Sequence, residues 1–286
     1  MQFRGIFMRI IKADIISKEV ARLAVEANYF LGSDMRNALQ KGLDEEKSEV
    51  GKEIFQQLIN NANIAAKEKM PICQDTGFAV VFIDIGNEVH IDGDIYDAVN
   101  KGISQGYKDG YLRKSIVENP FDRVNTGNNT PAVVHLRFVP GDKVKIIVAP
   151  KGGGSENMSK INMLKPADGI EGVVDFVLNT VDQAGANPCP PIIVGVGIGG
   201  TFEKAALLAK RSLLRPINDR NSDEKIAELE DELLKKVNQL GIGPLGLGGI
   251  KTALSVKIEI FPCHIASLPV AVNLNCHAAR HKECII

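Results

Sequence analysis

Hydrophobic residues recur every three or four positions through the first 70 residues, the spacing that places them on one face of an α-helix. The pattern predicts a helical N-terminal portion between about residues 10 and 70, divided into segments 14–32, 33–43 and 45–70. Ser33 is the expected N-cap of the second segment. The third segment carries an apolar stripe made of Val50, Ile54, Leu58, Ala62 and Ala65.

Apolar runs rich in β-branched residues predict strands along the rest of the chain. The run FAVVFIDIG at 78–86 predicts a buried strand, and residues 132–139 and 143–150 flank a Pro-Gly-Asp turn that predicts a hairpin. Further strands are expected at 190–196, 253–261 and 269–274, with helices at 94–119, 165–185, 201–214 and 223–240. No repeat or linker interrupts this pattern. It therefore predicts a single α/β domain over residues 1–286, with a mixed β-sheet core and a helical N-terminal layer.

The charge balance narrows the class of partners. The chain has 34 Lys and Arg against 35 Asp and Glu, so its net charge of −1 indicates no face for nucleic acid or for a membrane surface. No apolar stretch approaches the roughly 20 residues of a membrane-spanning helix. The first 15 residues lack the apolar segment of a secretion signal, so we expect a cytoplasmic protein. Met8 offers an alternative start.

The five cysteines are odd in number and widely spaced, which argues against a disulfide framework. Cys73, Cys189 and Cys276 each lie where a strand meets a turn rich in Pro, Gly or amide side chains. Backbone N–H groups of such turns can reach sulfur, as the ligands of an iron–sulfur cluster require. Three thiolates would leave one iron open as a Lewis acid. The alternative is that each cysteine is a small buried apolar residue, and Cys263 and Cys284 fit that alternative better.

Several polar residues beside these cysteines and elsewhere in the chain are candidate functional residues. Gln74 and Asp75 directly follow Cys73, and His264 directly follows Cys263. Arg113 and the glycine-rich loop at 151–157 could hold carboxylates, since a guanidinium binds them through two hydrogen bonds and such a loop presents N–H groups. A solvated surface charge and a tight turn are the alternatives for these two features.

Five motifs occur in one order over most of the chain: MPICQDTG, NTGNNTPAVVH, APKGGGSENMS, NPCPPIIVGVGIGGTFEKA and SLPVAVNLNCHAARH. Together they resemble the class I fumarate hydratases and the L-tartrate dehydratase α subunits, which are iron–sulfur hydro-lyases. The resemblance implies that a [4Fe-4S] cluster is bound by Cys73, Cys189 and Cys276. It also implies that Asp75 and His264 lie near the substrate hydroxyl, and that Gln74, Arg113 and the Gly153 backbone lie near its carboxylates.

The resemblance further implies a dicarboxylate substrate and a partner. Reversible hydration of fumarate to L-malate is the expected reaction, with dehydration of L-tartrate to oxaloacetate as the alternative. Single-chain members of the family have a second, C-terminal domain that supplies the catalytic base and further cations. This chain ends ten residues after Cys276, so we expect a separate β subunit and an α2β2 assembly.

Two other functions remain open, and the first of them is suggested by the segment GVGIGG at 195–200. Its spacing after a strand and before a helix is typical of dinucleotide binding, so an NAD(P)-dependent oxidoreductase is one alternative. A non-catalytic metal-binding or scaffold subunit is another. No second strand with an acid at its end is expected at the required distance. We therefore expect these glycines to pack a strand closely against a helix while holding the Cys189 turn, in a fold that is not a Rossmann fold.

Overall fold

The computed structural model describes residues 8–286, which form two compact units. Unit 1 comprises residues 8–31, 64–151 and 280–286, and unit 2 comprises residues 32–63 and 152–279. Both units combine helices with a β-sheet, so the predicted α/β class is confirmed. Each unit has its own four-stranded sheet rather than a share of one common sheet, and unit 1 also contains a two-stranded sheet. Residues 1–7, which precede the alternative start at Met8, lie outside the described residues.

The sheet of unit 1 has the strand order β10-β5-β2-β4. The buried strand β2 (Phe78–Gly86) lies in the middle, parallel to β4 (Val133–Val139) and antiparallel to β5 (Val144–Lys151). The predicted hairpin of β4 and β5 is therefore wrong. The Pro-Gly-Asp turn does reverse the chain, but the apolar β2 inserts between the two strands and pairs with both. Strand β10 (Lys282–Ile285) closes the other side of β5.

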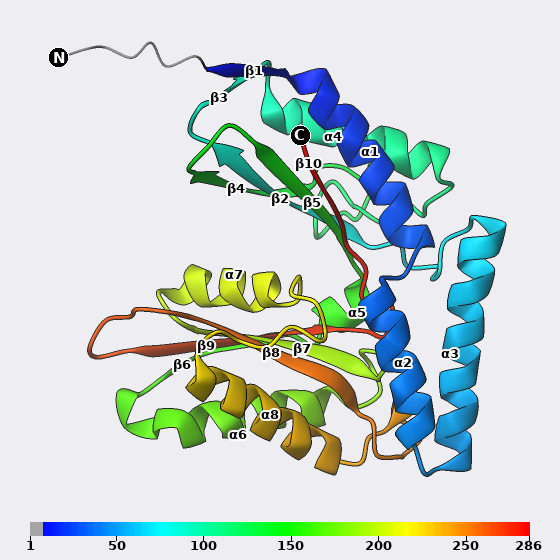
Figure 1. Cartoon of the computed structure of the whole chain (residues 1–286), viewed down its shortest axis with the longest axis vertical. Coiled ribbons are helices and arrows are strands. Elements are labelled where there is room, and N and C mark those ends of the chain that lie inside the picture. The colour runs from blue at the N-terminus through cyan, green and yellow to red at the C-terminus, as the bar shows by residue number, and fades with distance from the viewer. Residues whose placement is uncertain (1–7) are drawn as a thin grey trace. The chain divides into compact units, whose positions relative to one another are not determined.

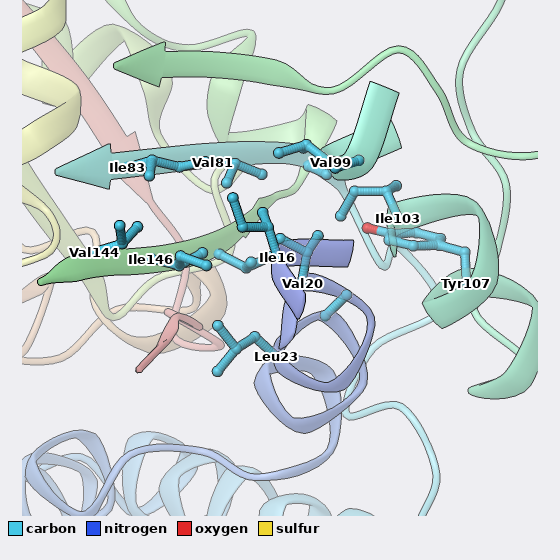
Figure 2. Packing of buried hydrophobic residues seen from close by; sticks show 14 of the residues in the cluster. Ile16, Val20, Leu23, Val81, Ile83, Val99, Ile103, Tyr107, Val144 and Ile146 are labelled. Carbon is cyan, nitrogen blue, oxygen red and sulfur yellow. The ribbon is translucent and has the colours of Figure 1, made fainter. Parts of the chain in front are cut away.

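Two helices cover this sheet. Helix α1 (Ala13–Tyr29) packs on α4 (Ile95–Asp109), and a Cβ added at Gly102 would lie 2.5 Å from the Ser17 carbonyl oxygen, so the two helices approach closely. Figure 2 shows side chains of both helices meeting those of β2 and β5 in one core. The helix predicted over 94–119 ends at Asp109, and an irregular segment follows it. Strands β1 (Arg9–Lys12) and β3 (Val89–Asp92) form a parallel pair beside this core.

The sheet of unit 2 has the strand order β6-β9-β7-β8. Its strands are β6 (Lys160–Leu164), β7 (Ile192–Gly199), β8 (Ala253–Phe261) and β9 (Leu268–Asn275). One face is covered by α7 (Phe202–Ser212) and the other by α6 (Gly169–Ala184) and α8 (Glu224–Gln239), as Figure 1 shows. The short helix α5 (Gly153–Glu156) and two 3-10 turns, Pro166–Asp168 and Pro244–Gly246, complete the connections.

The predicted helical N-terminal portion is confirmed by α1, α2 (Ser33–Glu45) and α3 (Glu49–Glu68). Ser33 is not the N-cap: α2 begins at Ser33 itself and Gly32 precedes it without a side-chain cap. Val50 is exposed because it lies in the first turn of α3, whereas the rest of the predicted stripe is buried. Within residues 8–286, no helix is both long and apolar enough to cross a membrane.

The GVGIGG segment packs as predicted. Strand β7 runs parallel to β8, and α7 and α8 connect the two strands. A Cβ at Gly195 or Gly197 would overlap carbonyl oxygens of α7, so both glycines serve close strand–helix packing. The Gly200 N–H donates to the Pro262 carbonyl oxygen at 3.2 Å and is thus already used within the fold. These contacts do not favour a phosphate-binding loop.

Candidate functional site

The loop that carries Cys73 joins α3 to β2 in unit 1. The Cys73 thiol is half-buried and Gln74 is exposed. The Ile72 N–H donates to the Asn28 carbonyl oxygen at 2.9 Å, which fixes the start of the loop on the end of α1. The Asp75 carboxylate accepts from the Gly77 N–H at 3.0 Å. Cys73, Gln74 and Asp75 therefore lie on one well-anchored turn.

Buried polar groups hold the end of the Cys73 loop. The Tyr107 hydroxyl is fully buried and donates toward the carbonyl oxygens of Thr76 and Gly77, at 2.7 and 3.0 Å. The Asn129 side chain donates to the Gly77 carbonyl oxygen at 3.2 Å and accepts from the Ser115 N–H at 2.7 Å. Burial raises the pKa of Tyr107, so this hydroxyl remains a neutral donor.

The same contacts bring Arg113 to the Cys73 loop. The Thr76 hydroxyl donates to the Arg113 carbonyl oxygen at 2.9 Å, while the Arg113 side chain is exposed. Within residues 8–286 its guanidinium has no ion pair. Unit 1 thus gathers Gln74, Asp75 and Arg113, three of the predicted site residues, around one loop.

Arg280 is a site residue that the sequence analysis missed. Its Nη2 donates to the Asp75 carbonyl oxygen at 2.6 Å, and the residue is only 4% exposed. Its Nε and Nη1 atoms are buried without a hydrogen-bond partner in the described part of the chain. Arg280 lies in the motif NLNCHAARH, but nothing local in the sequence indicated that its side chain would be buried.

Unit 2 brings Cys189 and Cys276 together. Cys189 precedes β7 and Cys276 follows β9, and the register pairs Ile193 with Asn275, so both cysteines lie at the same end of the sheet. The Cys189 carbonyl oxygen lies 3.0 Å from Nδ1 of His277 and 3.4 Å from its backbone nitrogen. The Cys189 thiol is exposed and the Cys276 thiol half-buried, so neither is a sealed core cysteine.

The glycine-rich segment lies beside the same turn. Residues Gly153–Glu156 form one helical turn, α5, instead of the expected open loop. A Cβ on Gly154 would lie 3.5 Å from the Asn187 carbonyl oxygen, which places α5 against the turn before Cys189. The Asn273 side chain of β9 donates to the Glu156 carboxylate at 2.9 Å and ties α5 to the sheet. Gly153 is exposed next to this cysteine pair.

His264 is not at this end of unit 2. It lies in the exposed loop between β8 and β9, beyond Phe261, whose partner in β7 is Gly199. Strand β9 has eight residues, so about 25 Å separates this loop from Cys276 at the usual rise of an extended strand. In Figure 1 the loop lies at the opposite end of the sheet from α5. Within unit 2, the structure does not bring His264 to Cys189 and Cys276.

The two remaining cysteines differ from each other. Cys263 is exposed and its thiol donates to the Ser267 carbonyl oxygen at 3.2 Å, so the expectation that it is buried is wrong. The loop after β8 leaves the sheet at Pro262, and residues 262–266 are exposed. Cys284 in β10 packs on the core of unit 1, and burial raises the pKa of its thiol to about 11. A neutral, partly buried thiol is a poor metal ligand and a poor nucleophile.

Comparisons with known proteins identify the family of this chain. The family model for fumarate hydratase (Fumerase) matches residues 17–285. The chain belongs to the fumarate hydratase (Fumerase) family. It is 45% identical over 273 residues to a Methanocaldococcus jannaschii protein with the provisional name L(+)-tartrate dehydratase subunit alpha, covering 93% of this chain and 95% of that one. It is 34% identical over 275 residues to L(+)-tartrate dehydratase subunit alpha of Escherichia coli O157:H7, covering 95% and 90%.

Membership of this family indicates a hydro-lyase. The predicted cluster ligands are divided between the units, with Cys73 in unit 1 and Cys189 and Cys276 in unit 2. Over residues 8–286, no group of three or more His, Cys, Asp and Glu side chains is gathered around one metal position. The donors themselves suit a cluster: their thiols are accessible or half-buried and lie on turns, and the Cys73 turn is bound by the buried Arg280 guanidinium.

Proposed function

We propose that this chain is the cluster-binding α subunit of an iron–sulfur hydro-lyase that dehydrates L(+)-tartrate. The names of the relatives favour this alternative over the fumarate hydration that we first expected. Hydration of fumarate remains the second candidate, because the family model carries that name. The observation that supports the proposal most is the pairing of the Cys189 and Cys276 turns, held by His277 next to the glycines of α5.

The proposed cluster is a [4Fe-4S] group held by the thiolates of Cys73, Cys189 and Cys276. When bound, it supplies a Lewis acid that polarises the hydroxyl which leaves. The donor set supports this assignment, since Cys263 lies at the opposite end of the unit 2 sheet from Cys189 and Cys276, and burial raises the pKa of Cys284. The buried Arg280 guanidinium next to the Cys73 loop also suits a site that holds negative charge.

The residues of the Cys73 loop would bind and orient the dicarboxylate. The Arg113 guanidinium is exposed and suited to a carboxylate through two parallel hydrogen bonds. Gln74 adds an exposed amide beside it, and Gly153 adds a backbone N–H. The Asp75 carboxylate, fixed by the Gly77 N–H, would transfer the proton that goes to the departing oxygen. Loss of water from tartrate gives the enol of oxaloacetate.

His264 would act on a second copy of this chain. Its loop lies at the opposite end of the sheet from Cys189 and Cys276, so it cannot serve the cysteine pair that belongs to the same sheet. An exposed loop can instead reach the site of a neighbouring α subunit. The proposed α2β2 assembly provides such a neighbour.

A β subunit would supply the catalytic base and further cations. The relatives are named as alpha subunits, which supports a partner chain. Around Arg113, the irregular segment after α4 exposes Tyr111, Phe121 and Val124, with 88, 92 and 59% of their surfaces accessible. Large apolar side chains exposed around a substrate-binding residue are suited to a protein partner that shields the site from water.

Anaerobic assays test this proposal. The chain is purified alone and with its partner subunit, reconstituted with iron and sulfide, and assayed with L(+)-tartrate, L-malate and fumarate. We expect turnover of tartrate by the two-chain complex and negligible turnover by the single chain. Faster turnover of malate or fumarate than of tartrate would assign the second candidate. Iron-free activity, or tight nicotinamide binding that requires Gly197, would contradict the proposal.

A further inference from the structure

Arg280 has an unusual environment for a guanidinium. It is 4% exposed, and its only hydrogen bond within residues 8–286 is the one from Nη2 to the Asp75 carbonyl oxygen. Its Nε and Nη1 atoms are buried and have no partner there. A buried charged donor is costly unless an acceptor or a negative charge offsets it. The described residues provide Arg280 with no carboxylate partner.

The position of Arg280 in the chain suggests which negative charge it serves. It lies four residues after Cys276 in the sequence. Its hydrogen bond fixes the backbone two residues after Cys73, on the turn that also carries Gln74. Arg280 is therefore close along the chain to one proposed thiolate ligand and bound to the loop of another. The Tyr107 hydroxyl, which anchors the same turn, is kept neutral by burial and cannot supply a counter-charge.

We propose that Arg280 is a positioning residue for the cluster: it fixes the Cys73 turn through the Asp75 carbonyl and offsets the negative charge of the thiolates. This inference rests on the proposed function. A cluster with one open iron is held by only three protein ligands, so each ligand matters for its retention. A nearby fixed cation would help to retain it, because the positive charge reduces the repulsion among the thiolates. The guanidinium can do both tasks at once, because Nη2 binds the carbonyl while the delocalised charge acts on nearby thiolates.

Two substitutions separate the two tasks. Arg280→Gln keeps a donor for the Asp75 carbonyl but removes the charge, and Arg280→Lys keeps the charge but loses the fork. Lys282→Gln is the matched control, because it removes one positive charge from the same segment in a residue outside the site. Each variant is prepared as the reconstituted complex with the β subunit and as the metal-free α chain.

The measurements are iron per chain, the rate of iron loss to a chelator, the reduction potential of the cluster, and the thermal midpoint of the metal-free chain. We expect Arg280→Gln to lose iron at least about tenfold faster than the unsubstituted complex and to shift the potential to more negative values, because a positive charge near the cluster favours the reduced form. Arg280→Lys should restore the potential while still losing iron faster. Lys282→Gln should match the unsubstituted complex.

Three results would overturn the inference. One is an Arg280→Gln complex with unchanged iron loss and potential. Another is a potential that stays the same in both Arg280 variants while the metal-free chains lose thermal stability, which would make Arg280 purely structural. The third is an equal effect of Lys282→Gln. If Arg280→Gln does not fold, Arg280→Lys decides the question: an unchanged potential with faster iron loss supports the inference, and unchanged iron loss overturns it. An unsubstituted complex that binds no iron would instead refute the proposed function.

Discussion

Cys189 combines an accessible thiol with a left-handed backbone conformation, φ 55°. Non-glycine residues adopt that region only where surrounding contacts hold them there. At Cys189 those contacts are the N–H bond to the Ala186 carbonyl oxygen at 3.0 Å and the two contacts of its own carbonyl oxygen with His277. The backbone around this thiol is thus fixed while its sulfur remains reachable, which is the condition that a metal ligand needs.

The five cysteines should divide into two groups on substitution by serine. Cys73→Ser, Cys189→Ser and Cys276→Ser should each lose iron, and hydro-lyase activity should fall by about 100-fold or more, since loss of an outer-shell partner alone costs roughly 10- to 100-fold. Cys263→Ser and Cys284→Ser should keep both, since neither thiol lies on a turn beside another candidate ligand. Iron analysis and anaerobic assay of the five variants provide the measurement. Equal losses in all five would contradict the assignment.

The thiols of the metal-free chain should also differ in reactivity. The thiolate is the reacting species, so a thiol with a raised pKa reacts slowly below that pKa. Burial raises the pKa of Cys284 to about 11, and its alkylation should accelerate only as the pH approaches that value. Cys189 and Cys263 are exposed and should be modified first at pH 8. Mass spectrometry of peptides after timed iodoacetamide treatment measures the order. Rapid modification of Cys284 at pH 8 would contradict the burial argument.

At the scale of elements, the strong sequence patterns predicted the structure well. The long amphipathic helices and the apolar strands β2 and β8 occur where their periodicity indicated. The hairpin of β4 and β5 was wrong because a turn specifies only that the chain reverses, not which strand pairs beside it. Strands β6 and β10 were missed because both are short, half-exposed edge strands without a continuous apolar run. The contacts of Tyr107, Asn129 and Arg280 join distant segments, and no local pattern encodes them.

The two glycine-rich segments should respond differently to alanine. Gly197→Ala would push a methyl group into the Ala205 carbonyl of α7, and overpacking of this kind costs about 1–3 kcal/mol. It should lower the midpoint of chemical unfolding. Gly153→Ala lies in an exposed helical turn and should leave that midpoint nearly unchanged. If its backbone binds a substrate carboxylate, the same change should raise KM more than it lowers kcat. Unfolding curves and steady-state kinetics on both variants distinguish these effects.

At the scale of the whole molecule, the predicted site residues belong to three structural segments, namely one loop region of unit 1 and the two ends of the unit 2 sheet. Gln74, Asp75 and Arg113 share one loop region of unit 1, and Gly153 joins the cysteine pair of unit 2. His264 lies at the far end of the unit 2 sheet, and neither the motif nor its spacing indicated this. Sequence resemblance assigns a residue to a site without saying which copy of the chain delivers it. The position of His264 therefore leads to the claim that this residue acts in the active site of a second α subunit.

Complementation between two inactive variants tests that claim. His264→Ala and Cys189→Ser should each abolish activity as homogeneous assemblies, because each lacks one part of every site. In a hybrid with one α chain of each kind, the intact cysteines of the first chain would meet the His264 of the second and form one complete site. Random co-assembly should then restore about one quarter of the unsubstituted activity, since half of the pairs are hybrids and each has one working site of two.

Two affinity tags on the α chains allow the hybrid to be purified, and its specific activity should then approach about half of the unsubstituted value. A hybrid of Cys189→Ser with Cys276→Ser is the matched control. Both of its chains lack a cluster ligand, so it should stay inactive under either arrangement. An inactive hybrid of His264→Ala with Cys189→Ser would mean that His264 serves its own chain, and the strand register would have to change for it to do so. Full activity of His264→Ala alone would remove the residue from the mechanism.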